Sequence, residues 1–564
     1  MSIKEIFTSS SSSSSVVSPD TVTENGDAAF SSTFSSCLDF FGTVCRSEKR
    51  LSRDVEIKIL DLLPKMWQED PLLTTKLIFH KRDCREGAGE KAIFYTCYKW
   101  LLTNHPNTAY ENMKHFPFFG YWKDYLALLD PHSVYPNDNN QKVQKIAEIF
   151  AKQLLQDLDT FEKYGKQEED VKSSDLDLPE EVKEEIKEEN KEDETKQEHS
   201  SKDEEKVTSA TNQQKPKIPH VSLCAKWAPT NKLSVDRRHK ICKLIANAMG
   251  YDDKWQMHYR KALSKLRHHL DIVEKNMCAK LWSLIKLDKV PSVCMMKNKK
   301  AFKKNMPNEF AEWMSNLKTG KTKVNAKQLM VHELIELRNL ADELTQHQWN
   351  TIRDHLKTKG SLGGVIPVSD VSGSMNGIPM QVSVALGIMI SELAEEPFKD
   401  LMITFSSDPQ FFKFEGKTLS DKVYSIHNSG SIGYNTDIIK TFKVLLDRCV
   451  EYKLTQEKMP KKVLIITDGQ FDEQTRNSDS TSFETIKRMY NSKGYEPPVL
   501  VLWNVRGNIT SVPITKHSTG SILISGWSTN LLKSIMEATD LPTPMDVMMQ
   551  TISVPRYDCI KVVD

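Results

Sequence analysis

The sequence predicts an α plus α/β protein, in which an all-helical region is followed by a C-terminal domain built on a mostly parallel, Rossmann-like sheet. The spacing of apolar residues supports this, because it is helical up to about residue 360 and changes to short continuous runs from Leu362 onward. The length supports it too, because 564 residues can bury more than one hydrophobic core. We therefore expect several domains along the chain.

The first 36 residues are rich in Ser and Thr and contain few large apolar side chains. Such a segment buries too little surface to offset the conformational entropy lost on ordering. It lacks the apolar stretch of a signal peptide, and no segment elsewhere reaches the roughly 18 apolar residues that span a bilayer. We expect a disordered leader at residues 1–36 in a soluble, cytoplasmic protein without a membrane span, with the nucleus as the open alternative.

Residues 37–160 carry the pattern of a first helical part, as in Ile57, Leu60 and Leu63. The composition then changes over residues 161–217, where an acidic run with almost no aromatic side chains begins. Between residues 160 and 206 there are 19 acidic residues and 9 lysines, a net charge of −10. This composition predicts a disordered linker, although Glu and Lys four residues apart favour short helical stretches within it.

Helical periodicity resumes over residues 218–360, which we assign to a second, basic helical part. This segment holds 28 Lys and Arg against 13 Asp and Glu, a net charge of +15. Such an excess is the electrostatic footprint of a surface that binds RNA phosphates, although lysines also solubilise helix faces without binding a ligand. The candidates for phosphate contacts are the most closely spaced lysines: Lys297, Lys299, Lys300, Lys303 and Lys304.

Residues 361–564 are predicted to form the α/β domain. Short apolar runs indicate strands buried on both faces, at residues 365–368, 401–405, 463–466, 499–503 and 522–524. Helical segments lie between them, at about residues 379–395, 436–452, 482–491 and 531–538. An edge hairpin is expected at residues 411–414. Since sheets of this kind bind ligands beyond the carboxyl ends of their strands, polar residues at those ends are the candidates for a site.

The first predicted strand runs into the sequence D-V-S-G-S-M, which places the carboxylate of Asp370 and the hydroxyls of Ser372 and Ser374 on one tight turn. Oxygen ligands alone suit a hard divalent ion such as Mg²⁺ or Mn²⁺. Thr436, which opens a later helix, and Asp468, which follows a later strand, are expected at the same rim. The alternative is that these side chains cap helices and close turns without binding a metal.

No catalytic residue is predicted. The sequence G-W-S-T-N at residues 526–530 departs from a nucleophile elbow at its last position, and no histidine follows His517. A phosphate-binding loop of the G-x-x-x-x-G-K-[ST] type is absent from the sequence as well. We therefore expect a non-enzymatic protein, with metal-assisted hydrolysis left open because a bound metal can activate water.

The five oxygen-bearing residues, in this order, resemble the metal-ion-dependent adhesion site of von Willebrand factor A-type (vWA) domains. That pattern is D-x-S-x-S, then a Thr, then an Asp at the end of the fourth strand. The resemblance implies that Ser372 and Ser374 contact the metal directly, that Thr436 does so directly or in one conformation, and that Asp370 and Asp468 are anchors that often act through water. It also implies a coordination position left for an acidic ligand.

Two motifs in the helical part are similar to TROVE-type modules: R-D-x-x-x-G-x-G-E at residues 82–90 and G-x-W-x-D at residues 120–124. In the first we expect Asp83 and Glu90 to make buried polar contacts with Arg82 or Arg85. Combined with a vWA-type domain, the arrangement resembles the Ro ribonucleoprotein family and, more closely, a domain-of-unknown-function family with the same two halves. The resemblance implies HEAT-like helical repeats that form an RNA-binding ring, which the acidic linker interrupts here.

These observations give two hypotheses for the function. The first is a non-enzymatic RNA-binding or ribonucleoprotein-like scaffold, in which basic helices contact phosphates and the vWA metal site captures an acidic partner. The alternative is a scaffold for protein–protein interactions that uses the metal site without nucleic acid. The two differ in a measurable way, because RNA affinity carried by lysines falls steeply with salt. The sequence predicts no oligomeric state.

Overall fold

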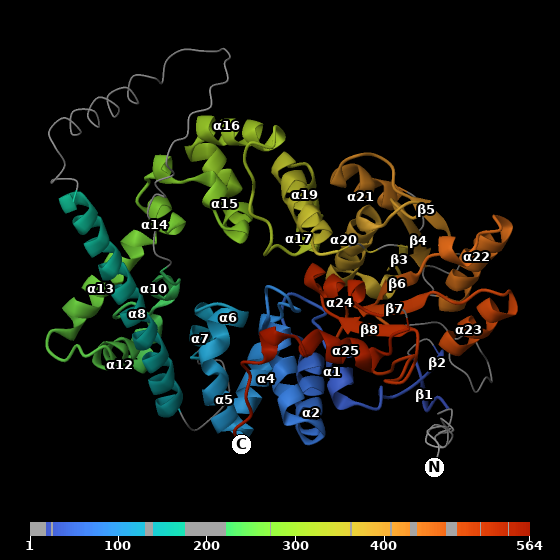
Figure 1. The fold of residues 1–564 in the computed structure, drawn as a ribbon, viewed down its shortest axis with the longest axis horizontal. Helices are drawn as coiled ribbons and strands as arrows, with labels where there is room; N and C mark the ends of the chain where they lie inside the picture. Colours follow the sequence, from blue (N-terminus) through green and yellow to red (C-terminus); the bar gives the residue numbers. More distant parts are fainter. Residues whose placement is uncertain are drawn as a thin grey trace. The chain divides into compact units, whose positions relative to one another are not determined.

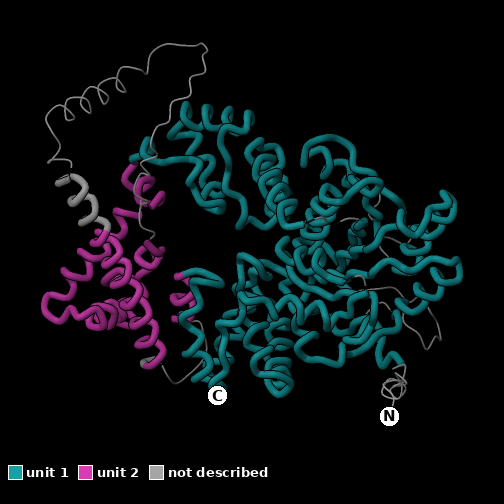
Figure 2. Tube along the Cα trace, viewed as in Figure 1, with its two compact units in different colours: residues 1–121, 281–564 teal, residues 122–280 magenta. Residues whose placement is uncertain are grey.

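The computed structural model describes most of the chain. The described residues are 18–23, 26–129, 139–174, 221–270, 272–360, 362, 364–405, 409–428, 437–469, 482–507, 509–539 and 541–564. They form two compact units, shown in Figure 2: the first comprises residues 1–121 and 281–564, and the second residues 122–280. The predicted boundary at residue 360 does not coincide with a boundary between these units.

The second unit is helical in its described residues. Its helices are α7 (Lys123–Leu128), α8 (Asn139–Ser174), α10 (Cys224–Trp227), α11 (Ser234–His239), α12 (Ile241–Ala248), α13 (Trp255–His269) and α14 (Val273–Cys278). Helix α8 packs against α10, α12 and α13. It does so through the buried side chains of Ile146, Phe150 and Leu154, whose four-residue spacing places them on one helix face.

Helix α8 continues beyond the point at which the linker was predicted to begin, and it ends at Ser174. A reason is contact with α13, where Lys265 forms an ion pair with Glu162 of α8 at 3.1 Å. The prediction of disorder is therefore wrong for residues 161–174. The rest of the predicted linker, residues 175–217, lies outside the described residues.

The first unit contains helices from both ends of the predicted helical region. Those from the first part are α1 (Ser36–Thr43), α2 (Arg53–Glu69), α3 (Pro71–Arg82), α4 (Lys91–Asn104), α5 (Pro106–Asn112) and α6 (Phe116–Phe119). Those from the second part are α15 (Ser292–Asn305), α16 (Pro307–Lys318), α17 (Val331–Leu334), α18 (Leu337–Leu340) and α19 (Glu343–Lys357). Local signals set their ends, as at α3, where the Asp70 side chain accepts from Leu73 N at 2.8 Å and Pro71 occupies the first turn.

The sheet of the first unit has six strands: β3 (Val365–Asp370), β4 (Leu401–Phe405), β5 (Phe411–Lys413), β6 (Lys462–Thr467), β7 (Val499–Asn504) and β8 (Ser521–Ser525). Their order is β5-β4-β3-β6-β7-β8 (Figure 1). All neighbours are parallel except β4 and β5, which form the predicted antiparallel edge. The prediction of a helical region followed by a mostly parallel α/β sheet is confirmed.

Helices cover both faces of this sheet. Alternate strand residues such as Ile366, Val463 and Leu500 form one core with α22 (Ile438–Glu451) and α23 (Ser482–Ser492). The opposite residues face α20 (Ile378–Leu393), where a Cβ on Gly387 would lie 2.2 Å from Ser369 Oγ. Three further helices complete the domain: α21 (Leu419–Asn428), α24 (Leu532–Met536) and α25 (Pro544–Ile552). All residues of β3, β7 and β8 are buried, as are all but the first residue of β4 and of β6, whereas the edge strand β5 has no buried residue.

The N-terminal segment joins this domain, although the sequence placed it in a disordered leader. Two short strands, β1 (Thr21–Val22) and β2 (Ala28–Ala29), pair with each other. Phe30 then forms an antiparallel bridge with Val512 and is 4% exposed. Several contacts thus hold this polar segment: the buried ring of Phe30, its backbone pairing with Val512, and a hydrogen bond from Ser482 Oγ to the buried Asp27 at 2.6 Å. The prediction of disorder is wrong for the described part of residues 18–36, and residues 1–17 lie outside the described residues.

Helix α1 fastens the helices to the sheet by lying directly against β8. A Cβ on Gly42 of α1 would lie 2.5 Å from Leu523 Cγ, so this contact needs glycine. Beside it, the buried Lys81 donates to Ser525 Oγ at 3.0 Å and to Val44 O at 2.7 Å. The helices before residue 121 and the sheet are therefore parts of one packed body.

No helix in the described ranges is long and apolar enough to cross a membrane, and all ten cysteines are free.

Candidate metal centre

The predicted site lies where the strand order of the sheet reverses. The chain leaves β3 toward β4 on one side, whereas β6 lies on the other side of β3. In doubly wound sheets, ligands bind at the carboxyl ends of the strands at such a switch point. Asp370 is the last residue of β3, and Asp468 directly follows β6.

The turn after β3 is held by the side chain of Asp370. One carboxylate oxygen accepts from Ser372 N at 2.9 Å, and the other accepts from Thr467 Oγ1 of β6 at 2.8 Å. The hydroxyl oxygens of Ser372 and Ser374 lie 3.0 Å apart. Two hydroxyls at this distance can both reach a single ion.

Arg506 is a member of this cluster that the sequence analysis did not identify. It follows β7, the strand next to β6, and its Nη1 donates to Ser374 O at 2.5 Å and to Asp468 Oδ2 at 3.3 Å. The signal that could have found it is its place just beyond the end of a predicted strand. Arg506 balances one of the two carboxylates, so a negative charge remains.

Burial determines the electrostatics of the two carboxylates. Asp370 and Asp468 are 0% and 1% exposed. Burial and, second to it, the nearby charge of Asp468 raise the pKa of Asp370 to about 7, although hydrogen bonds from Ser372 and Thr467 oppose the shift. A cation placed here would therefore stabilise both ionised carboxylates.

The structure brings together four of the five predicted ligands: Asp370, Ser372, Ser374 and Asp468. The fifth, Thr436, lies outside the described residues. Its neighbour Asp437 caps α22, because its side chain accepts from Lys440 N at 2.7 Å. The side chain of Asp437 is thus used as the N-terminal cap of α22.

The donor set fits a hard divalent cation. It consists of carboxylate and hydroxyl oxygens, the ligands that Mg²⁺ and Mn²⁺ prefer. Within the described ranges, no three or more His, Cys, Asp or Glu side chains gather in one place, so a metal here would depend on the serine hydroxyls. With a divalent ion bound and both carboxylates ionised, the cluster with Arg506 would carry one net positive charge, which would attract an acidic group of a ligand.

The five predicted phosphate-binding lysines lie on α15. Lys299 differs from the other four, because its Nζ forms an ion pair with Asp342 at 2.7 Å and its side chain is 12% exposed. Lys297, Lys300, Lys303 and Lys304 are exposed, and none of them forms an ion pair with a carboxylate in the described part of the chain. Spacings of three and four place Lys297, Lys300 and Lys304 on one helix face.

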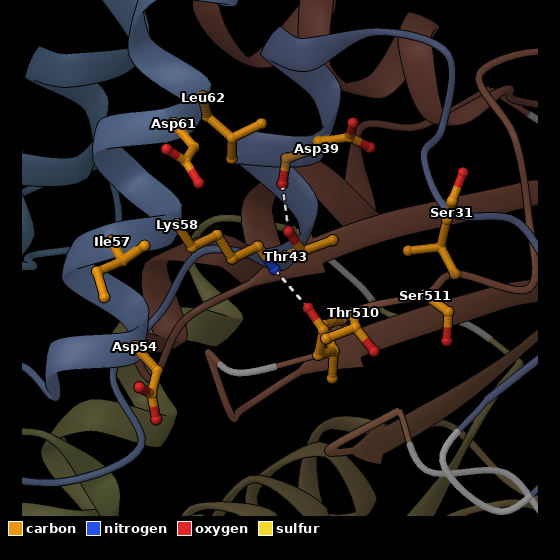
Figure 3. A pocket seen from close by; sticks show the side chains of 12 residues that line it. Ser31, Asp39, Thr43, Asp54, Ile57, Lys58, Asp61, Leu62, Thr510 and Ser511 are labelled. Atoms are coloured by element: carbon orange, nitrogen blue, oxygen red, sulfur yellow. Dashed lines mark hydrogen bonds between the residues drawn. The ribbon is translucent and has the colours of Figure 1, made fainter.

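A separate cavity of about 360 Å³ lies between α1, α2 and the loop that follows β7 (Figure 3). Lys58 points into it and donates to Ile509 O at 2.7 Å. Asp39 accepts from Thr33 N at 2.8 Å and from Ser32 Oγ at 2.6 Å. Because these groups connect the N-terminal segment, the helices and the sheet, we attribute the cavity to the joint between them and assign it no ligand.

The two carboxylates of the first TROVE-like motif, Asp83 and Glu90, form ion pairs with residues outside the motif. Glu90 forms a buried ion pair with Arg46, and Asp83 forms one with Arg556, whose Nη2 donates to Asp83 Oδ1 at 2.9 Å. Asp83 also accepts from the backbone N–H of Arg85 at 3.0 Å, so the expected polar contact with Arg85 is present for Asp83, while the ion-pair partners of both carboxylates lie outside the motif. The partners lie far away in the sequence, which is why local spacing did not indicate them.

The fold and the site together define a class of protein: helices packed on a doubly wound α/β domain with carboxylate and hydroxyl side chains at its switch point. Two overlapping segments, residues 23–215 and 143–362, match DUF2828, a domain of unknown function, and residues 364–554 match DUF7788, another domain of unknown function. The chain is also 30% identical over 555 residues to "Uncharacterized protein L728" of Acanthamoeba polyphaga mimivirus, over 94% of this chain and 86% of that protein. The chain belongs to the DUF2828 family. The two matches indicate neither a TROVE nor a vWA family.

Proposed function

We propose that the protein is a non-enzymatic scaffold that captures an acidic ligand through a divalent metal ion, Mg²⁺ or Mn²⁺, in a vWA-like domain. One observation carries the proposal: two serine hydroxyls 3.0 Å apart lie with two buried carboxylates at the switch point of the sheet. Asp468 follows the fourth strand of the six, which is the position of the last acidic residue in the vWA pattern.

The roles of the residues follow from their contacts. Ser372 and Ser374 would provide direct ligands, because their hydroxyl oxygens lie 3.0 Å apart and keep lone pairs for an ion. Asp370 has one hydrogen bond to each carboxylate oxygen and would act as an anchor that balances charge. Arg506 would hold Asp468 and the turn at Ser374 in place. The ligand would complete the coordination with a carboxylate.

Metal binding to the full-length chain tests this proposal. After treatment with chelator, isothermal titration with Mn²⁺ should give one site in the wild-type protein, and the Ser372→Ala/Ser374→Ala variant should lose it. The matched control is Ser425→Ala/Ser492→Ala, which removes two hydroxyls that donate to their own helices. Binding that is equal in all three proteins, or absent from the wild type, would contradict the proposal.

RNA binding is a second candidate, favoured by the four exposed lysines of α15 that have no ion pair within the described ranges. Here the scaffold would be ribonucleoprotein-like, and the helical parts would resemble TROVE modules and HEAT-like repeats. Affinity for single-stranded RNA should fall steeply with salt, and changing Lys297, Lys300, Lys303 and Lys304 to Glu should weaken it. The control changes four exposed lysines of the sheet domain to Glu: Lys399, Lys417, Lys443 and Lys453. Equal weakening by both sets would reject the α15 surface.

A further inference from the structure

Basic side chains from five separate segments of the first unit converge on one cavity of about 560 Å³. They are Arg85 from the connection between α3 and α4, Lys327 from the loop before α17, Lys359 just after α19, Lys533 of α24, and Arg556 of the turn at Pro555–Tyr557. Glu86 is the one carboxylate among the described lining residues. Cations brought together from such distant positions indicate a surface that favours an anion.

Nearby carboxylates balance only part of this charge. Arg556 is committed to the buried Asp83, and Lys533 forms an ion pair with Glu86 at 3.3 Å. In the ranges that the structure describes, Arg85, Lys327 and Lys359 have no carboxylate within ion-pair distance. Three positive charges in the cavity therefore have no ion-pair partner among the described residues.

The remaining cations repel one another. The pKa of Lys359 is lowered, mainly by burial and in part by the charges of Lys533 and Lys327, although Glu86 acts in the opposite direction. The pKa of His355, which also lines the cavity, is lowered by burial and then by Lys359 and Lys327. An anion bound among them would relieve this repulsion.

The cavity is built before any ligand arrives. Asp83 accepts from the backbone N–H groups of Arg85 at 3.0 Å and Glu86 at 3.2 Å, which fixes the turn that presents both side chains. The guanidinium of Arg85 donates to Phe118 O at 2.8 Å and Gly120 O at 3.2 Å. Its other N–H groups stay available, and a guanidinium held in one orientation suits the paired oxygens of a phosphate.

We propose that this cavity binds a compact polyphosphate, meaning a small molecule that carries two or more linked phosphate groups. Its volume lies in the range of small-ligand pockets, about 300–1,000 Å³. Cations surrounding one concavity fit a compact polyanion, whereas a nucleic-acid strand needs an extended groove that follows its backbone. The inference does not depend on the proposed metal site, since none of its lining residues belongs to that site.

Titration of the full-length chain with inorganic pyrophosphate and tripolyphosphate, in the presence of chelator, tests the proposal. The wild-type protein should bind both, and Lys327→Gln/Lys359→Gln should weaken binding by about tenfold or more, because two counter-charges are lost. Neither lysine has an ion pair to lose, so the variant should keep the wild-type melting temperature. The matched control, Lys300→Gln/Lys304→Gln on α15, removes the same charge and should bind as the wild type does.

Two results would overturn the proposal. One is an affinity for pyrophosphate that is undetectable, or that falls equally in the cavity variant and the α15 control. The other is single-stranded RNA that binds through Lys327 and Lys359 while pyrophosphate fails to displace it, which would assign the cavity to nucleic acid instead. Pyrophosphate binding that persists in Ser372→Ala/Ser374→Ala would support the proposal, because it separates this cavity from the metal site.

Discussion

At the carboxyl ends of β3 and β6, the carboxylates of Asp370 and Asp468 lie together at 0% and 1% exposure. In the basic cavity, by contrast, cations such as Arg85 and Lys327 are exposed. Each region concentrates charge of one sign. In each region one residue of the opposite charge balances part of this charge: Arg506 contacts Asp468 at the end of β6, and Asp83 forms an ion pair with Arg556 beside the cavity. The two clusters of charge therefore differ mainly in how deeply their charged groups are buried.

The difference indicates what each region can bind. A buried pair of carboxylates interacts strongly because water does not screen it, and only a small ion can reach both. An exposed cluster of cations is screened by water and salt, and it can accept a larger, partly hydrated anion. The following predictions would break or sharpen this contrast.

The largest effect is expected where the basic cavity depends on a buried ion pair. Arg556→Ala would leave Asp83, whose side chain is 0% exposed, without its counter-charge. The free energy of unfolding should fall by about 3–5 kcal/mol. Denaturant titration followed by tryptophan fluorescence measures this.

The control for that experiment is Arg448→Ala. Arg448 forms an ion pair with Glu451 in which the side chains are 52% and 61% exposed. Its loss should lower the free energy of unfolding by at most about 1 kcal/mol. Equal losses in the two variants would mean that the pair of Asp83 and Arg556 is not buried in solution.

A smaller effect on stability is expected at the two carboxylates beside β3 and β6, where the stabilisation depends on added metal. Millimolar Mg²⁺ should stabilise the wild-type protein by about 1–3 kcal/mol through mass action. Asp370→Asn should lose this gain, yet the metal-free variant should be as stable as the metal-free wild type, because a repelling charge is removed. Thermal melts with and without Mg²⁺ measure both.

The control is Asp447→Asn, at an exposed helical position, which should keep the stabilisation by Mg²⁺. If this variant lost the stabilisation as well, the effect of Mg²⁺ would be nonspecific.

Salt should separate the two regions by a smaller margin. Raising KCl from about 50 mM to about 300 mM shortens the screening length, so the affinity of the exposed cavity for pyrophosphate should fall several-fold. The affinity of the buried carboxylates for Mn²⁺ should change less over the same range. Equal slopes in the two titrations would contradict the difference in depth.

The smallest expected effect distinguishes two adjacent lysines of α15. Lys299→Gln removes the ion pair with Asp342, in which the lysine is 12% exposed, and should lower the free energy of unfolding by about 0.5–1 kcal/mol. Lys300→Gln should change it by less than about 0.5 kcal/mol. RNA affinity should respond in the opposite order. An RNA affinity that depends more on Lys299 would contradict the assignment of Lys299 to a structural role.

Much of the α/β domain was predictable because its signals are local. The apolar run at residues 463–466 became β6, which spans Lys462–Thr467, and the helix expected at about residues 379–395 became α20, which spans Ile378–Leu393. Asp370 and Asp468 were found by the same logic, since polar residues that follow buried strands meet at one edge. Arg506 obeys this rule as well, but it belongs to no motif and was missed.

The N-terminal segment shows where composition fails as a guide. Its average is polar, and the sequence therefore predicted disorder through residue 36. Phe30 nevertheless pairs with Val512 and fills a place in the sheet core. A few buried side chains, here Phe30 and Asp27, can order a short polar segment when a core built elsewhere accepts them, and an average over a window does not contain that information.

The sequence by itself determined the order of helices and strands and the chemistry at the strand ends, because periodicity and turn residues act over a few positions. Only the tertiary structure decided the pairing of Asp83 with Arg556, 473 residues away, and the gathering of Arg85, Lys327 and Lys533 around one cavity. Such contacts depend on which surfaces pack together. The free energy of that packing comes from the whole core, so no local stretch of sequence encodes it.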